Sequence, residues 1–549
     1  MHVAGAADPS MLGDRGWGRS RTYPARSPSP EPRSSSALAL AALSAALLLA
    51  AAPPAGIPLL AFVALMPLLV VVRRTRSGVA AAALGWLTGA LFYAGLLPWL
   101  VPTLMRMQDI GATAAAALFG LFVAYHAGQF ALAALAMSAV GSRPGAVRAA
   151  LTVAAAWVVV EWAYPQVLPW SLGALLGPQR TLRQAADLAG VHGLAASIVA
   201  VNVLLAFGAR RVGVSLIAAL LGYGLLRQPS PADGHLRVGV IQAATPALRH
   251  DPDAANAVAW RSYAARSAGL ARRVDLLLWP EGVLRADLGN GGGYRRDAEQ
   301  LAAALQRPLL LGALGQGGNG RETNVIYAFA PRLLGRYAKH ALVPFGESVP
   351  TDWWPLDRWR TTGAFAPAAA NGPLRLTGGA VAVAVCFEAL RGDDLAAQVA
   401  AGAGWLLNPS DDSWFASPRA AAQHLEMTRL RAVETRRWLV RVSHSGASAV
   451  IDPGGEIVAA LPYGAAGELV ARIAPLHQLT PFTRWGDTPL LLASAAVLLG
   501  SVGRAGRPFG RPALAVHARS NNSTSASLSA CSATALSSLS AAPSPACRT

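Results

Sequence analysis

Three chemically potent side chains each follow or end an apolar run that is typical of a buried β-strand. Glu281 follows VDLLLWP, Lys339 lies in GRYAKHALVPFGE, and Cys386 ends AVAVAVC. Taken singly, each has an ordinary structural explanation: a surface carboxylate at a strand end, a solvated cation in a loop and a small buried hydrophobe. Because unpaired charge at the end of an apolar strand is costly to bury, we expect the three side chains to lie in one site.

A carboxylate, an ammonium and a thiol in one site could catalyse acyl transfer through a thioester. A thiol with an ordinary pKa of ~8.5 is mostly protonated at neutral pH, so it needs a base or a cation nearby. Glu281 would accept the thiol proton, and Lys339 would stabilise the thiolate and the oxyanion that forms when Cys386 attacks an ester. An amine would then attack the thioester, with Glu281 again carrying the proton, which predicts ping-pong kinetics.

A histidine could instead serve as the base for Cys386, in the manner of a Cys-His pair. Spacing along the chain does not reveal which side chains meet in space, so this alternative stays open. The candidate histidines are His340, His424 and His444.

The segment from about 229 to 482 alternates β-rich runs with polar helical stretches, which predicts one α/β domain with strands inside and helices outside. Cys386 falls within one of the predicted strands. The predicted strands are 236–243, 274–279, 308–314, 323–330, 380–386, 404–408, 438–444, 447–452 and 469–474, and the predicted helices are 252–272, 293–306 and 417–436.

The remaining sequence indicates a membrane protein. Hydrophobic residues make up 53% of the chain, charged residues 14%, and the mean hydropathy is +0.37. These values lie on the membrane side of a soluble average. The net charge of +18 could indicate nucleic-acid binding, but arginine is scattered through tails and short loops, so we expect no nucleic-acid partner. Apolar segments recur at roughly 37–52, 56–72, 78–101, 112–140, 148–163, 192–208, 213–226 and 488–503.

The distribution of arginine predicts the orientation of about eight spans, since cytoplasmic loops carry an excess of Lys and Arg. With a basic N-terminal arm inside, seven crossings place the α/β domain outside the cell membrane, and an eighth returns the tail to the cytoplasm. The loops assigned to the cytoplasm carry Arg73, Arg74, Arg76, Arg143, Arg148, Arg210 and Arg211, the tail carries Arg504, Arg507 and Arg511, and the outer loops carry Arg106, Arg180 and Arg183.

Two low-complexity arms flank this core. Residues 1–35 are rich in Ser, Pro, Gly and Arg, and residues 506–549 are rich in Ser and Ala, so we expect both to lack a packed fold. The tail holds Cys531 and Cys547, and a disulfide framework is therefore not expected. The predicted order is a basic arm at 1–35, seven helices at 36–228, the α/β domain at 229–482, a last helix at 483–505 and a tail at 506–549.

Six motifs resemble those of the apolipoprotein N-acyltransferases, the membrane-bound branch of the nitrilase superfamily. WPEG, YAKHALVPFGESVP and VCFE look like the family's three catalytic blocks, in the same order. SDDSWF at 410–415, QHLEMTRLRAVE at 423–434 and RVSHSGASAVIDPGGEI at 441–457 resemble its further landmarks. The resemblance covers residues 37 to 503 and implies a multi-pass helical membrane protein with an inserted αββα sandwich domain.

The resemblance also implies roles for residues beside the catalytic blocks. Glu347 and Glu388 look like the family's supporting carboxylates, and Phe387 stands where the family has an aromatic residue. In an extended strand, Glu388 would lie on the same side as Cys386, because side chains repeat every two residues.

The family's substrates and location follow from the same resemblance. The donor would be a glycerophospholipid and the acceptor the α-amino group of an N-terminal S-diacylglyceryl cysteine on an apolipoprotein, at the bacterial inner membrane with the catalytic domain on the periplasmic side. No cofactor or metal is implied. Tryptophan favours the headgroup region, so an aromatic lid near the bilayer is expected. Its candidate residues are Trp353, Trp354, Trp359, Trp414 and Phe415.

Two other functions fit parts of the sequence. One is a membrane-anchored amidase of the nitrilase type. The other is a transporter with a degenerate nitrilase domain, for which Glu161 and His126 would be the ionisable residues within the spans. The scarcity of such residues argues against transport.

Overall fold

The computed structural model describes residues 34–53, 56–140, 145–229, 234–245, 251–317, 320–348 and 365–505. Most of the predicted basic arm and the whole low-complexity tail lie outside these residues. So do three of the predicted lid residues, Trp353, Trp354 and Trp359.

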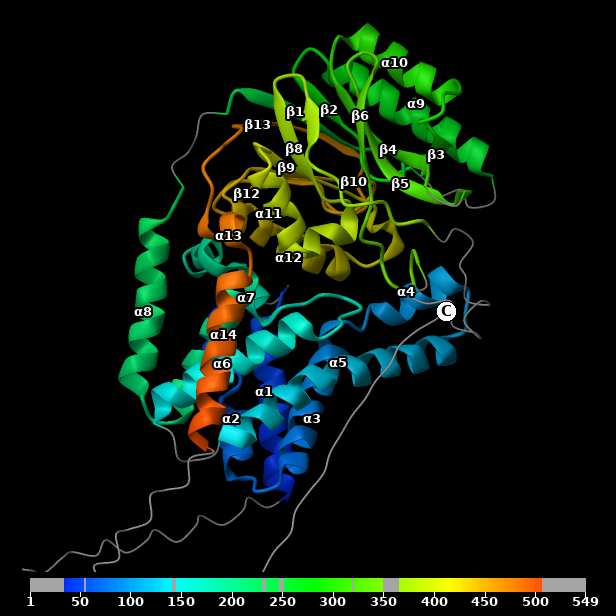
Figure 1. Ribbon diagram of the computed structural model, residues 1–549. Helices are drawn as coiled ribbons and strands as arrows, with labels where there is room; N and C mark the ends of the chain where they lie inside the picture. Colours follow the sequence, from blue (N-terminus) through cyan, green and yellow to red (C-terminus); the bar gives the residue numbers. More distant parts are fainter. Residues whose placement is uncertain are drawn as a thin grey trace, which may run out of the picture. The chain divides into compact units, whose positions relative to one another are not determined.

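Helices form the first part of the described chain (Figure 1). Among the described residues, five segments are long and apolar enough to cross a membrane by length and composition: α1 (Ser34–Ala51), α3 (Gly78–Leu96), α5 (Ala112–Val140), α6 (Ala146–Ala163) and Leu182–Ala206, which joins η3 (Leu182–Ala185) to α7 (Ala186–Ala206). The other helical elements are η1 (Pro58–Phe62), α2 (Met66–Arg74), α4 (Leu100–Gln108), η2 (Leu172–Leu176), α8 (Arg210–Leu226) and α14 (Thr488–Ala505).

The predicted apolar segment at 56–72 is broken into two short helices. Pro58 begins η1 and Pro67 lies in the first turn of α2, because proline lacks an amide hydrogen and starts a helix more readily than it continues one. The 9 residues of α2 rise only ~14 Å, against a hydrocarbon core of ~30 Å. The count of about eight spans therefore stays a prediction.

Close packing of α3 on α5 depends on two glycines four positions apart. A Cβ atom at Gly85 would lie 2.3 Å from the carbonyl oxygen of Phe130, and one at Gly89 would lie 2.9 Å from Cα of Ala127. Small residues at this spacing let helix backbones approach each other in lipid, where no hydrophobic effect drives helices together. A larger side chain at either position would force the two helices apart.

The chain between α8 and α14 contains two sheets and their covering helices. The strands are β1 (Leu236–Gln242), β2 (Leu276–Leu278), β3 (Leu284–Asp287), β4 (Leu309–Gln316), β5 (Glu322–Phe329), β6 (Leu333–Ala338), β7 (Leu374–Leu376), β8 (Gly379–Val383), β9 (Trp405–Ser410), β10 (Leu439–Ser443), β11 (Ala449–Ile451), β12 (Ile457–Ala460) and β13 (Gly467–Ile473). The helices are α9 (Pro252–Leu270), α10 (Gly293–Leu305), η6 (Cys386–Leu390), α11 (Gly392–Ala400), η7 (Asp412–Trp414), α12 (Pro418–Thr435) and α13 (Pro481–Trp485).

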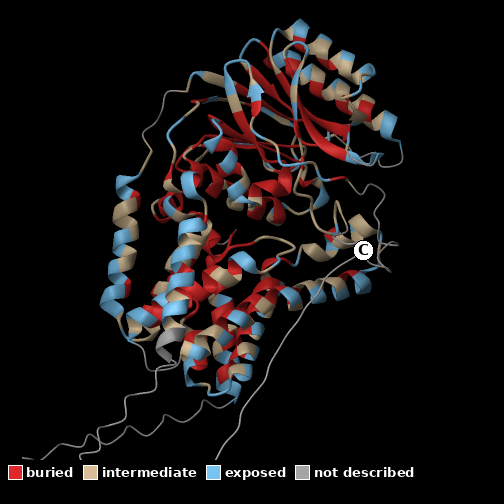
Figure 2. Cartoon of the chain, in the orientation of Figure 1, coloured by how far each residue is buried: buried red, intermediate tan, exposed pale blue. Residues whose placement is uncertain are grey.

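These elements stack as helix, sheet, sheet and helix (Figure 1). One sheet has the order β13-β1-β2-β4-β5-β6, with β3 on β4, and the other has the order β12-β11-β10-β9-β8-β7. Apolar side chains of both sheets, such as Val240 and Val440, form the core between them, and Figure 2 shows much of the strand surface buried. α9 and α10 cover one outer face, and α11 and α12 cover the other.

The two ends of this sandwich are neighbouring strands. β1 and β13 pair antiparallel, with Leu236 opposite Ile473. The chain therefore enters and leaves the sandwich at adjacent points of one sheet.

All nine predicted strands and all three predicted helices are present with shifted ends, but the environment predicted for Cys386 is wrong. β8 ends at Val383, and Cys386 begins η6 with a φ of 51°. A left-handed residue cannot continue a strand, so the argument that Glu388 shares a strand face with Cys386 fails. The strands and helices between α8 and α14 that were not predicted are β3, β6, β7, β12, η6, α11, η7 and α13.

A buried carboxylate joins the helical part of the chain to the sandwich. Asp187, at the start of α7, accepts hydrogen bonds from Tyr223 Oη at 2.7 Å and from two guanidinium nitrogens of Arg227, Nη2 at 3.0 Å and Nε at 3.1 Å. Arg436, directly after α12, donates two further hydrogen bonds to Asp187 at 2.9 and 3.0 Å. The Asp187 carboxylate thus neutralises the charge of Arg227 from the helical part and of Arg436 from the sandwich.

Removal of this carboxylate should destabilise the folded protein. Asp187→Ala would leave the largely buried Arg436 guanidinium uncompensated, and we expect a loss of about 3–5 kcal/mol. Thermal unfolding in detergent micelles measures the effect. Asp275→Ala is the matched control, because it breaks the Arg237–Asp275 pair, whose side chains are partly exposed to solvent, so we expect a much smaller shift. Equal shifts for the two variants would contradict the role of Asp187.

Candidate active site

The carboxylate of Glu281 is held between the two sheets by three donors. Glu281 follows β2 by three residues and is 5% exposed. Its Oε1 atom accepts hydrogen bonds from Asn324 Nδ2 at 2.6 Å and from Lys339 Nζ at 3.1 Å. Its Oε2 atom accepts one from the Asp411 main-chain amide at 3.0 Å. Both oxygens are therefore fixed in orientation.

The ammonium of Lys339 is fully buried between two carboxylates. Lys339 follows β6 directly, and its amide donates to the carbonyl oxygen of Asn324 at 2.8 Å. Its Nζ atom donates to Glu347 Oε1 at 2.6 Å as well as to Glu281. Glu347 is itself oriented by the Val343 amide, which donates to Oε2 at 2.8 Å. Paired charges of this kind are the form in which an ammonium tolerates burial.

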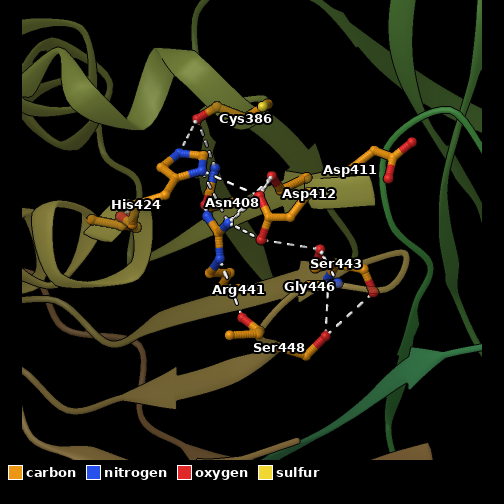
Figure 3. Close-up of polar contacts among 12 residues, drawn as sticks. Cys386, Asn408, Asp411, Asp412, His424, Arg441, Ser443, Gly446 and Ser448 are labelled. Atoms are coloured by element: carbon orange, nitrogen blue, oxygen red, sulfur yellow. Dashed lines mark hydrogen bonds and ion pairs between the residues drawn. The ribbon is translucent and has the colours of Figure 1, made fainter. Parts of the chain in front are cut away.

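Cys386 lies three residues beyond β8, at the start of η6, and is 8% exposed. Its carbonyl oxygen accepts hydrogen bonds from His424 Nε2 at 3.2 Å and Asn408 Nδ2 at 3.4 Å (Figure 3). The Cys386 φ of 51° is a conformation that residues other than Gly, Asn and Asp rarely adopt. The turn therefore has to be held by surrounding contacts.

Glu388 ties the Cys386 turn to the Lys339 segment. Its Oε1 atom accepts hydrogen bonds from the amides of His340 and Ala341, at 2.8 and 3.0 Å. Its Oε2 atom accepts one from the Val385 amide at 2.7 Å and one from Tyr337 Oη at 3.1 Å. This fully buried carboxylate therefore fixes the residues on both sides of Lys339 relative to the residue before Cys386.

Burial and mutual charge set the protonation states in the site. Burial raises the pKa of Glu281 to about 7, against the opposing charge of Lys339. Burial alone would lower the pKa of Lys339, but the carboxylates of Glu281 and Glu347 hold it well above its ordinary value. Burial, and then the charge of Glu281, raise the pKa of the Cys386 thiol. At neutral pH the site thus contains a neutral thiol, a charged ammonium and a carboxyl group within its titration range.

Two family models match this chain. The apolipoprotein N-acyltransferase N-terminal domain matches residues 44–204, and the carbon-nitrogen hydrolase domain matches residues 237–479. The apolipoprotein N-acyltransferase of Gloeobacter violaceus is 33% identical over 488 residues, which cover 84% of this chain and 92% of that protein. This chain belongs to the apolipoprotein N-acyltransferase family.

Other relatives agree with this membership. The apolipoprotein N-acyltransferase of Caulobacter vibrioides is 30% identical over 525 residues, which cover 86% of this chain and 96% of that protein. Among solved structures, an amidase from Nesterenkonia sp. covers 45% of this chain and 93% of its own at 20% identity, with a TM-score of 0.34. Membership confirms the resemblance predicted from the sequence motifs and makes this chain a membrane protein with a carbon-nitrogen hydrolase domain.

The three histidines considered as a base have other partners. His340 contacts Glu388 and Asp394, which raise its pKa to about 9. His444 contacts Thr245 and the hydroxyl of Tyr263. His424 contacts the Cys386 carbonyl oxygen through Nε2. The geometry favours Glu281 over a histidine as the charge partner of the thiol.

The aromatic residues predicted near this site lie at the junction with the helical part. Phe387 lines a cavity of about 390 Å³, together with Trp162 and Trp170 from the segment at and beyond the end of α6. Trp414 is 46% exposed, and the Phe415 ring packs on Trp99, beside α4, at 5.2 Å between centroids. The two described lid candidates therefore belong to a loop that contacts the helical part of this family member.

Sequence reasoning missed three groups that orient the site: the side chains of Asn324 and Asn408 and the main-chain amide of Asp411. A buried amide side chain within an apolar strand, as in TNVIYAF and WLLNPS, was the available signal. Such a group must be hydrogen-bonded when it is buried, but its partner cannot be read from spacing.

The protonation state of Glu281 should control the reactivity of Cys386. Above pH 7 the carboxylate is free to accept the thiol proton, and below pH 7 it is increasingly protonated, so we expect alkylation of Cys386 by iodoacetamide to rise through an inflection near pH 7. Glu281→Gln should remove this inflection and slow alkylation about 100-fold. Peptide-level mass spectrometry measures labelling at Cys386 alone. Glu299→Gln, on α10, is the control; an unchanged profile in Glu281→Gln would refute the coupling.

Proposed function

We propose that this protein transfers a fatty acyl chain from a glycerophospholipid, through a thioester on Cys386, to the α-amino group of an N-terminal S-diacylglyceryl cysteine of an apolipoprotein. The observation that carries this proposal is the buried Glu281, Lys339 and Cys386 arrangement in a chain of this family with long apolar helices. Glu281, Lys339 and Cys386 are its proposed catalytic residues.

In the first half-reaction, Cys386 Sγ attacks the ester carbonyl carbon of the phospholipid. Glu281 accepts the thiol proton, because burial raises its pKa into the working range. Lys339 stabilises the oxyanion of the tetrahedral intermediate, since its charge is held by two carboxylates and does not depend on pH near neutrality. Collapse breaks the ester C–O bond, and the proton on Glu281 passes to the departing lysophospholipid alkoxide.

In the second half-reaction, the neutral acceptor amine attacks the thioester carbonyl carbon. Glu281 takes the proton that the nitrogen loses as the amide forms, and the C–S bond breaks. The sulfur leaves as a thiolate beside Lys339 and regains a proton from Glu281, which restores the starting state. One carboxyl group thus carries protons in both directions, which suits a pKa of about 7.

The supporting residues act through these three. Glu347 keeps Lys339 charged and oriented. Glu388 holds the Lys339 segment against the Cys386 turn. Phe387 provides an apolar wall, and the loop with Trp414 and Phe415 forms the edge where lipid chains enter, because aromatic side chains favour the membrane interface.

The arginine pattern supports an orientation for the whole chain. About eight spans, with both termini cytoplasmic, place the sandwich on the periplasmic side of the inner membrane. The acyl donor would then arrive from the outer leaflet. The transporter alternative has less support, since both carboxylate oxygens of Glu161 accept hydrogen bonds, from Trp157 and Leu172.

Incubation with phospholipid should leave an acyl group on Cys386. We expect intact mass spectrometry of the purified protein to show an adduct of fatty-acyl mass that maps to Cys386 and disappears on addition of a diacylglyceryl-cysteine peptide. Cys386→Ala should form no adduct, whereas a control with Cys531→Ala and Cys547→Ala should form it normally. Release of ammonia from amides without an adduct would instead support the amidase.

Cysteine labelling should reveal the proposed orientation. Ala304→Cys places a thiol on an exposed position of α10, and Gly145→Cys places one in the loop before α6. In a background without Cys386, Cys531 and Cys547, a membrane-impermeant maleimide added to spheroplasts should label Ala304→Cys and label Gly145→Cys only after lysis. The reverse pattern would overturn the orientation.

A further inference from the structure

A second set of buried charges lies beside the two side chains that contact the Cys386 main-chain carbonyl. Arg441 on β10 and Asp412 in η7 form an ion pair with Nη2 to Oδ2 at 2.7 Å, and both side chains are fully buried (Figure 3). The proton transfers described above do not use this pair. A buried ion pair is weak evidence for stability, so its geometry needs another explanation.

Arg441 contacts both groups that donate to the Cys386 carbonyl oxygen. Its Nη1 atom donates to Asn408 Oδ1, and its Nη2 atom lies 3.1 Å from His424 Nδ1. The other atoms of the same two side chains face main-chain carbonyls. His424 Nε2 faces the Cys386 oxygen, and Asn408 Nδ2 faces the Cys386 oxygen and also donates to the Ala384 oxygen at 2.6 Å. The Arg441 guanidinium therefore contacts both side chains that donate hydrogen bonds to the Cys386 carbonyl oxygen.

This contact determines which end of each donor faces Cys386. A guanidinium only donates, so the Asn408 atom beside it must be the amide oxygen, which turns the NH₂ group toward the carbonyl. A carbonyl oxygen only accepts, so His424 Nε2 must carry a hydrogen. Burial and the charge of Arg441 lower the pKa of His424, and in the neutral ring Nδ1 then accepts from Arg441.

Asp412 and its neighbours fix the guanidinium itself. Asp412 Oδ1 accepts from Ser410 Oγ at 3.0 Å and lies 3.2 Å from His424 Nδ1, the contact that an imidazolium would use. A Cβ atom at position 446 would approach Asp412 Oδ2 to 2.0 Å, so Gly446 leaves the space that this carboxylate occupies. In either protonation state of His424, the Nε2 hydrogen faces the same carbonyl.

We propose that His424 and Asn408, which Arg441 orients, are positioning residues that hold the Cys386 carbonyl and keep the nucleophile in its left-handed turn. This inference rests on the proposed role of Cys386 as the nucleophile. Substitution of His424 should displace the turn more than substitution of Asn408, because the His424 hydrogen bond to the Cys386 carbonyl is the shorter of the two. His424 thus acts on the thiol through the main chain and not as a base.

The test compares two substitutions of His424 in the full-length protein. His424→Leu removes the donor, and displacement of the turn should slow acyl-enzyme formation on the order of 100-fold without a change in the KM for phospholipid. His424→Gln retains an NH₂ donor and should recover most of the rate. The inflection near pH 7 should persist in both variants, since it belongs to Glu281.

Three outcomes would overturn the proposal: a wild-type rate in His424→Leu, no recovery in His424→Gln, or loss of the pH inflection, which would make His424 the base. Where His424→Leu fails to accumulate, Asn408→Asp provides a second test, because it removes the hydrogen bonds that Asn408 Nδ2 donates to the Cys386 and Ala384 carbonyls with little change of shape. Iodoacetamide labelling of Cys386 in the same variants separates this proposal from the proposed function. If wild-type protein forms no acyl adduct but His424→Leu still slows alkylation, the proposed function fails and the positioning role stands.

Discussion

The site depends on an ammonium ion buried between two carboxylates. An isolated ammonium in the core would lose its proton or unfold the domain, so Lys339 can remain charged only while Glu281 and Glu347 stay within hydrogen-bonding distance. The same requirement places three separate segments together: the end of β2, the end of β6 and the loop that follows it. Two carboxylates around one ammonium leave an excess negative charge. Burial, together with the charge of Glu347, therefore raises the pKa of Glu281 to about 7.

The pairing also explains how one acid group can serve opposite tasks. A carboxylate with an ordinary pKa would accept the thiol proton poorly and would rarely be protonated when a leaving group needs a proton. Raising that pKa without a cation would require the carboxyl group to sit alone in an apolar pocket. Here the Lys339 ammonium stabilises the charged form of Glu281 and opposes the effect of burial. The protonated and charged forms of Glu281 are therefore both populated near pH 7.

Much of this arrangement could be predicted from the sequence because apolar runs identify strands and chemically costly residues mark their ends. Glu281 and Lys339 follow strands as expected, and family motifs add Glu347 and Glu388. The Cys386 environment could not be predicted, since VAVAVCFEA reads as a continuous strand and its left-handed turn is imposed by long-range donors such as His424. Short edge strands such as β12 have weak patterns, and the break at 56–72 reflects proline positions that hydropathy alone ignores.

The antiparallel pairing of the first and last strands of the sandwich has a consequence for biosynthesis. A ribosome releases β1 long before β13, so the edge of β1 that β13 will cover remains open while the whole intervening domain emerges. Closing that edge is a contact of very long sequence separation, which folds slowly. The sheet is complete only when β13 has been synthesised and has paired with β1, so a chain that stalls before that point leaves the edge of β1 unpaired.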